Sequence, residues 1–163
     1  MAGTFTKPKA YNRRIFINFG TETAASWAEV AAGITSRGAS VSEQSEDYYD
    51  MAGRGVAETE TTGVKIGRTF SGYRVIGDTA QDEVFWNRMT DLNKRQVEVI
   101  EFYDNITGTT NGRKGTAAIS ISDDGSGDAT ARENISFGYT FIGEPKAGKV
   151  TLTGGVPTFT DKV

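Results

Sequence analysis

The sequence predicts a mainly β fold, a β-sandwich or open barrel with one packed α-helix and a long inter-strand loop. Short runs of alternating apolar and polar residues recur along the 163-residue chain, and turns rich in its 20 glycines separate them. One segment, at about residues 79–93, has a helical period instead. Strands on both sides of one helix favour a layered β architecture. The length indicates one domain at residues 13–157, with an N-terminal arm at 1–12 and a C-terminal tail at 158–163.

The first half of the chain contains three predicted strands, at residues 13–19, 38–44 and 64–76. In the first strand, Ile15, Ile17 and Phe19 share one side. In the third, the apolar residues change parity at Gly72, which indicates a bulge or a sharp bend. Between the first two strands, the alanine-rich residues 23–32 predict one or two turns of helix.

The main helix is predicted to begin at Asp78 or Thr79, because either side chain can accept hydrogen bonds from the free N–H groups of a first turn. Phe85, Met89 and Leu92 then form an apolar stripe at helical spacing. This stripe predicts that the helix packs on the sheet through one side.

Three more strands are predicted after the helix, and a short pair follows them, at residues 96–104, 116–122, 129–142, 150–153 and 156–159. The segment DDGSGD, at residues 123–128, reads as the tip of a hairpin. After it, Ile135, Phe137, Tyr139 and Phe141 lie on one strand face and predict an aromatic row in the core.

The long loop is predicted at residues 46–63, between the second and third strands. Loops of this length are uncommon in compact domains and are usually functional or disordered. An acidic cluster at its start, Glu43, Glu46, Asp47 and Asp50, could supply a carboxylate pair for hydrolysis. No cleft is indicated nearby, so a solvated acidic loop is the favoured interpretation.

Composition excludes several classes of function. The chain has no cysteine and no histidine, which excludes disulfides, thiolate nucleophiles, serine–histidine triads and Cys/His zinc sites. A net charge of −3 gives no clustered basic surface for gripping nucleic acid. No apolar run is long enough to span a bilayer, and the polar N-terminus is not a secretory signal. We therefore expect no enzyme, no cofactor, no metal site and no membrane association.

Two glycine-rich segments resemble nucleotide-binding motifs without matching them. GRGVAE at residues 53–58 lacks the third glycine of a dinucleotide fingerprint, and GTTNGRKGT at 108–116 has the wrong spacing for a P-loop. The DDGSGD segment has glycines where a calcium loop needs side-chain oxygens. All three segments are interpreted as turns.

Several predicted strand faces carry small, hydroxylic residues. Free sheet faces usually carry lysine and glutamate instead. Two interpretations remain open: an ordinary solvated face, or a face that lines a shared, confined space. The residues concerned are Ser40, Ser42, Gln44, Ser120, Ser122, Asn134, Ser136 and Thr140.

The order of these features resembles the major tail tube proteins of long-tailed, non-contractile bacteriophages. The resemblance covers about residues 13–157 and rests on order and spacing, with no single specific motif. The segments that carry it are ASWAEVAAGI, SEQSEDYYD, MAGRGVAETETTG, VKIGRTFSGY, DTAQDEVFWNRM and FIGEPKAGKVTLTGGVPTF.

The resemblance implies a structural virion protein of the phage tail, assembled in the host cytoplasm. Six copies would form a ring, and stacked rings would form a hollow tube through which DNA passes during ejection. A tape measure protein would fill the lumen before that. A tail terminator and baseplate or tip proteins are the other implied partners.

The resemblance also implies roles for particular residues. The long loop would reach the next ring, with aromatic anchors buried at the contact. Its residues would be Glu46, Asp47, Tyr48, Tyr49, Asp50, Met51 and Arg54. Our own inference from the residues is that the hydroxylic faces line the lumen of such a tube, because a basic wall would bind DNA phosphates. Four basic residues count against this assignment if they lie there: Arg13, Lys65, Arg74 and Arg132.

The alternative is a monomeric β-sandwich that serves as a binding or decoration module of a phage particle. Such a module needs exposed aromatic residues on one concave face. Most aromatic residues of this sequence lie instead at strand positions that are expected to face the core.

Overall fold

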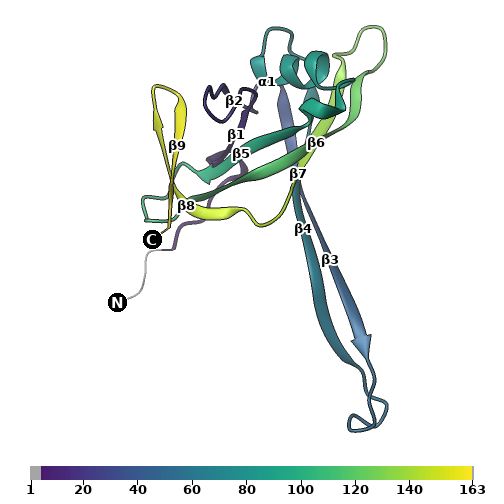
Figure 1. The fold of residues 1–163 in the computed structure, drawn as a ribbon. Helices are drawn as coiled ribbons and strands as arrows, with labels where there is room; N and C mark the ends of the chain where they lie inside the picture. Colours follow the sequence, from purple (N-terminus) through teal and green to yellow (C-terminus); the bar gives the residue numbers. More distant parts are fainter. Residues whose placement is uncertain (1–4, 163) are drawn as a thin grey trace.

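The computed structural model describes residues 5–162, which form one nine-stranded antiparallel sheet with short helical segments (Figure 1). The predicted mainly β class is confirmed. The strands are β1 (Arg13–Asn18), β2 (Trp27–Glu29), β3 (Ile34–Tyr48), β4 (Glu58–Tyr73), β5 (Gln96–Tyr103), β6 (Gly112–Ser126), β7 (Asn134–Phe141), β8 (Lys146–Thr153) and β9 (Val156–Asp161). The helical segments are η1 (Ala10–Asn12), α1 (Thr79–Asp82), η2 (Glu83–Asn87) and η3 (Leu92–Lys94).

The sheet forks at β6. Its path runs β2-β1-β5-β6-β7-β4-β3, and the β8–β9 hairpin joins β6 as a branch. Residues 112–118 of β6 pair with β5, whereas residues 117–126 pair with β7 on the other side. Strand β6 therefore belongs both to the part of the sheet that carries β5 and β1 and to a four-strand part made of β6, β7, β4 and β3.

The main apolar core lies on one side of the sheet, which we call the helix face. Val84 and Phe85 of η2 cover it, and the Phe85 ring meets that of Phe137 edge to face, with centroids 5.6 Å apart. The predicted aromatic row is confirmed, because all four of its members are buried in this core: Ile135, Phe137, Tyr139 and Phe141.

A smaller core lies on the opposite side of β1 and β5. Phe16, Ile100 and Phe102 point there, since successive residues of a strand face opposite sides. The β8–β9 hairpin covers these residues with Val150 and Phe159. The same side of the four-strand part has no such cover among residues 5–162 and is called the open face below.

The helix is shorter than the predicted span of residues 79–93. Asp78 caps it as predicted, because its carboxylate accepts the Gln81 N–H at 3.1 Å. Regular α-helical bonding ends at Asp82, and the π-helical turn η2 follows to Asn87. Leu92 is 73% exposed, so its predicted place in the apolar stripe is wrong.

Just beyond the helix, another side chain binds the carbonyls that a further turn would use. The guanidinium of Arg95 donates hydrogen bonds to the main-chain carbonyls of Arg88 and Met89, at 3.1 and 2.7 Å. These carbonyls would otherwise accept from the next helical turn.

Three other predictions are corrected. Residues 23–32 contain the short strand β2 rather than a helix, and the Glu29 carboxylate binds the Arg14 guanidinium of β1 through two 2.8 Å hydrogen bonds. Residues 158–161 of the predicted C-terminal tail belong to β9. In the predicted N-terminal arm, residues 10–12 form η1, and residues 1–4 lie outside the described part of the chain, as does residue 163.

The turn between β6 and β7 also lies later than predicted. Strand β6 continues to Ser126, and residues 127–133 make the turn, so the predicted tip at 123–128 is displaced along the chain. Strand β7 accordingly begins at Asn134 rather than at residue 129.

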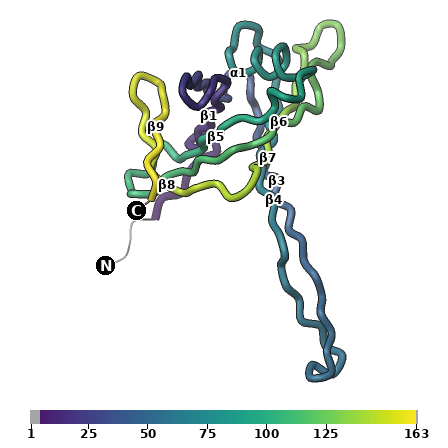
Figure 2. Tube along the Cα trace, in the orientation of Figure 1, coloured from purple at the N-terminus to yellow at the C-terminus, as the bar shows by residue number. Residues whose placement is uncertain are grey.

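The predicted loop at residues 46–63 is wrong in most of its length. Strands β3 and β4 continue through it as a paired ribbon, and only residues 49–57 form the turn (Figure 2). The ribbon is polar on both sides, so it lacks the apolar alternation that indicates a strand. The irregularity predicted at Gly72 is confirmed, because the ladder shifts register between Ile34 and Ser36, opposite that glycine.

Candidate assembly site

A two-stranded arm, residues 41–66, projects from the body of the protein (Figures 1 and 2). Its root is the pair Gly67↔Thr140, the last pair between β4 and β7. Beyond this pair, β3 and β4 bond only to each other within the described chain. Residues 41–48 span about 26 Å at ~3.3 Å per residue. All side chains at residues 41–50 are exposed, so the arm contributes little to the core.

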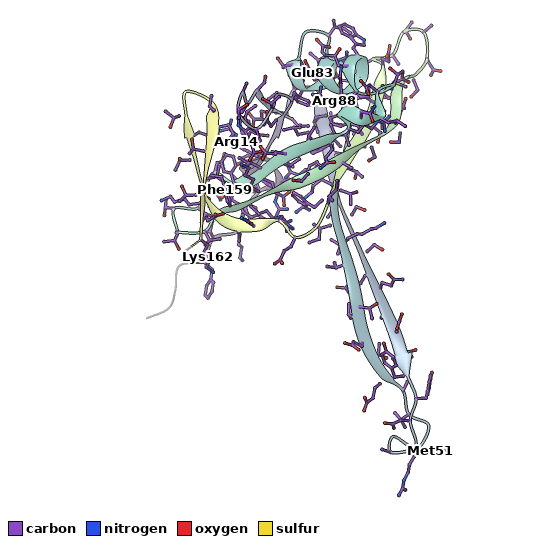
Figure 3. The ribbon with its side chains drawn as sticks, viewed as in Figure 1. Arg14, Met51, Glu83, Arg88, Phe159 and Lys162 are labelled. Atoms are coloured by element: carbon purple, nitrogen blue, oxygen red, sulfur yellow. The ribbon has the colours of Figure 1, made fainter. Side chains whose placement is uncertain are left out.

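The tip of the arm is a structured turn with exposed apolar side chains. Asp50 accepts the Gly53 N–H at 2.6 Å, and Arg54 adopts a left-handed conformation with φ 51° beside Gly55. Met51 is 97% exposed at the far end of the arm (Figure 3). The other exposed apolar residues of the tip region are Tyr48, Tyr49 and Val56.

The structure brings the seven predicted assembly residues together on this arm. Glu46, Asp47 and Tyr48 end β3, and the remaining four lie in the turn. The Tyr48 hydroxyl donates to the Glu46 carboxylate at 2.9 Å, and the Thr59 hydroxyl donates to Asp47 at 2.6 Å. These bonds are local, so the tyrosine rings stay available at the surface.

The arm is strongly acidic. Its ionisable residues are the carboxylates Glu43, Glu46, Asp47, Asp50, Glu58 and Glu60 and the basic residues Arg54 and Lys65. The arm is therefore net −4, although the whole chain is only −3. Among residues 5–162, none of the six carboxylates forms an ion pair. No ion pair in the described part of the chain therefore compensates this excess charge.

The open face gathers the small polar residues of four strands. Directly paired residues of an antiparallel sheet point to the same side. Three cross-strand rows therefore make up this face: Ser40–Gly67–Thr140–Ala118, Gly38–Thr69–Gly138–Ser120 and Ser36–Ser71–Ser136–Asp123.

The register places each predicted lumen residue relative to these rows. Ser40, Ser120, Ser136 and Thr140 lie in the rows, and Ser42, Gln44 and Asn134 continue the same parity at their ends. Ser122 departs from the pattern because the ladder shifts register between Ile121 and Asp123. Its hydroxyl donates to the Ser136 carbonyl at 3.2 Å.

Of the four basic residues that count against a lumen, two lie elsewhere and two lie at the margins of the open face. Lys65 pairs with Ser42 and so shares the open face on the arm. Arg132 stacks its guanidinium on the ring of Tyr73, 4.7 Å from the centroid. Tyr73 pairs with Asn134, so this stack lies at the end of the open face. Arg74 pairs with Asp82 of α1 at 2.7 Å, and Arg13 lies on β1, outside the four strands.

Two strand edges of the four-strand part are free. Among the described residues, β3 pairs only with β4, and β6 loses its pairing with β5 after Ala118. Ile119 donates its N–H to the Arg95 carbonyl, and residues 120–126 then have no strand on that side within the described chain. Each free edge offers unpaired main-chain groups to another chain.

Comparison with known proteins gives this geometry a context. No family model and no curated protein matches the sequence. The structure is similar to the tail of an empty gene transfer agent particle with C6 symmetry, with a TM-score of 0.63 and 13% identity over 88% of this chain and 100% of that chain. It is similar to the SPP1 tail tube, with a TM-score of 0.59 and 15% identity over 86% and 79% of the two chains.

The fold is that of phage tail tube proteins. A third similar structure is the tube-terminating cap of an anti-feeding prophage, with a TM-score of 0.52 and 18% identity over 99% of this chain and 95% of that chain. At these identities the likeness establishes the fold, and the expected tail tube architecture is confirmed at that level.

One cluster inside this tail tube fold was not predicted from the sequence. The carboxylate of Glu101 is 2% exposed and binds Arg68 of β4 at 3.1 Å, Arg113 of β6 and the Tyr139 hydroxyl of β7 at 2.6 Å. Burial raises the pKa of Glu101, but the Tyr139 hydrogen bond and the charges of Arg68 and Arg113 outweigh it, so the pKa lies below its usual value.

A signal for this cluster was present in the strand QVEVIEFY. Glu101 has the same parity as Val97 and Val99, which face the core. A glutamate at an inward position is almost never found without a partner. Its register partner across the ladder is Arg113.

Among residues 5–162, no group of three histidine, cysteine or acidic residues is arranged to hold a metal ion. No helix in this part of the chain is long and apolar enough to cross a membrane.

Proposed function

We propose that this chain is the structural subunit of a hollow tail tube, and that stacked rings of it deliver a phage genome to the host cell. The observation that carries the proposal is the four-strand part of a tail tube fold, with one small polar face and a free edge at each side. Six copies per ring is the number that the family resemblance implies.

The free edges suit ring closure between copies. Successive strands in the order β6, β7, β4, β3 run in alternate directions, and four is an even number. When a copy is rotated about a tube axis, its β6 therefore runs antiparallel to the neighbouring β3. The two edges can continue one antiparallel sheet around the ring and leave no edge exposed.

The open face suits the wall of the lumen. Its three rows contain glycine, serine, threonine and alanine, with one carboxylate at Asp123. DNA binding gains its strength from basic contacts to phosphates. A wall almost free of such contacts allows DNA to pass and a tape measure protein to occupy the lumen before ejection.

The arm suits a contact between rings. It projects from one end of the body and exposes aromatic and methionine side chains at its tip. Within residues 5–162, its strands pair only with each other. Aromatic side chains dominate the energetics of many interfaces once they are buried. The head-to-tail stack that results needs a terminator at one end and baseplate or tip proteins at the other.

The role is structural rather than enzymatic, and the protein belongs to the virion tail after assembly in the host cytoplasm. A monomeric binding or decoration module fits less well. The aromatic residues that such a module would expose are buried at Phe70, Phe137, Tyr139 and Phe141.

Negative-stain electron microscopy of the purified protein at increasing concentration tests this proposal. We expect rings or tubes with a central hole. A shortened variant separates contacts within a ring from contacts between rings. In it, an Asn-Gly turn replaces residues 46–60 and closes the ribbon at the pair Ser45↔Thr61. This variant should form rings that do not stack. A protein that remains monomeric at every concentration would overturn the proposal.

A further inference from the structure

A pocket of about 370 Å³ lies beside the start of β1, in the body of the protein. Apolar and aromatic side chains form much of its wall, and two guanidiniums lie in it. The lining residues used below are Arg13, Glu101, Tyr103, Ile106, Thr110 and Arg113. Its volume is that of a small binding pocket.

Two guanidiniums, those of Arg13 and Arg113, line the pocket against one carboxylate, that of Glu101. Glu101 is neutralised inside the protein by Arg68 and Arg113. Arg13 stacks over the Tyr103 ring, 4.6 Å from its centroid, and has no acidic partner among residues 5–162. The stretch around it, residues 5–14, contains four basic residues and no acidic one. The pocket therefore suits an apolar side chain accompanied by a carboxylate.

The tip of the arm presents that chemistry. Tyr49 is 67% exposed and stands next to Asp50 and Met51 in a net −4 arm. We propose that the pocket beside Arg13 receives the arm tip of another copy of this chain, with a tyrosine against the apolar wall and an arm carboxylate near Arg13. This inference rests on the proposed tube function and names the pocket that receives the arm tip in the contact between rings.

The arm cannot fill the pocket of its own subunit. Met51 lies at the far end of the projecting arm, whereas Arg14, the neighbour of Arg13, lies in the body (Figure 3). The ladder from Ser40 to Tyr48 holds the arm extended. A second copy is therefore the occupant that satisfies both surfaces, and opposite charges strengthen this match.

Cysteine cross-linking tests the inference, because the chain has no native cysteine. Met51→Cys combined with Thr110→Cys should give disulfide-linked oligomers in assembled tubes under mild oxidation. The matched control is Met51→Cys with Leu92→Cys, which places the second thiol at an exposed site on η3. This control should give at least tenfold less cross-linking.

Charge variants provide the second measurement. Arg13→Glu should raise the protein concentration needed for tube formation at least tenfold, and Arg13→Lys should raise it less than threefold. Circular dichroism melting should show that both variants fold. Tubes that form without the Thr110 cross-link, or that tolerate Arg13→Glu, would overturn the pocket assignment and leave the tube function standing. A lack of any ring or tube in the unmodified protein would overturn both.

Discussion

Tyr139 donates its hydroxyl hydrogen to the buried carboxylate of Glu101 at 2.6 Å, across two strands of the sheet. Burial and the adjacent carboxylate raise the pKa of Tyr139 far above its usual range, so the hydroxyl keeps its proton and remains a donor. Arg68 and Arg113 complete the cluster from β4 and β6. The root of the arm is thus tied to the core through charge as well as through main-chain pairing.

Tyr139→Phe is expected to lower the free energy of unfolding by about 1.5–3 kcal/mol, the usual contribution of a hydrogen bond to a charged group. Urea unfolding of the isolated subunit measures it. Tyr49→Phe removes the same atom from an exposed tyrosine and should change stability by less than about 0.5 kcal/mol. Equal effects in the two variants would show that the buried hydroxyl contributes nothing.

Stability should fall at acidic pH because of Glu101. Its pKa is lowered in the folded state, so the stabilisation is fully present above the unfolded value near 4.5 and is lost as the pH falls through the folded value. Glu101→Gln should lose about 3–5 kcal/mol at pH 7, because it leaves two guanidiniums without their buried partner.

Unfolding free energies of the wild type and Glu101→Gln between pH 7 and pH 2 measure this dependence. The wild type should lose stability steeply below about pH 4.5, and the variant should show a shallower slope over the same window. Parallel curves would contradict the assignment to Glu101.

The arm is expected to exchange its amide hydrogens without unfolding of the body. A two-stranded ribbon that packs against nothing is marginally stable in water, and residues 41–50 are all exposed. Hydrogen exchange with mass spectrometry should show fast exchange for residues 41–66 and slow exchange for β1, β5 and β7. Assembly into tubes should slow exchange in the arm, and an arm that remains unprotected in tubes would argue against an inter-ring contact.

Replacing both Tyr48 and Tyr49 with alanine should block tube growth while the melting temperature stays within a few degrees. The two rings are 49% and 67% exposed in the subunit, so they contribute little to its core. The matched control replaces both with phenylalanine, which keeps the rings and should restore tubes in electron micrographs. A large loss of thermal stability in the alanine variant would place the tyrosines in the core instead.

The sequence predicted the elements whose side chains alternate between core and solvent. The aromatic row of β7 and the cap at Asp78 are where expected, because burial and first-turn hydrogen bonds impose strong local patterns. The small polar residues of the predicted lumen also lie together. The alternation along each strand assigns them to one face, and the pairing of the strands places these faces side by side.

The missed features depend on contacts between distant residues. The arm is a ribbon without a buried side, so nothing in its sequence distinguishes a strand from a loop. The Arg95 guanidinium binds main-chain carbonyls just beyond the helix, and no helical period can reveal that contact. The position of Glu101 on the core-facing side of β5 indicates a buried carboxylate. Its partners Arg68 and Tyr139 come from other strands, so the sequence does not identify them.

The arm leaves the body on one side only, and this gives any stack of these subunits a direction. A stack of identical head-to-tail units has two unlike ends. One end presents free arms and the other presents unfilled pockets beside Arg13, so growth at the two ends involves different chemistry. A protein that stops growth at the arm end must offer a pocket for the arm tip. A protein that starts the stack at the other end must imitate an arm or leave the Arg13 pockets empty.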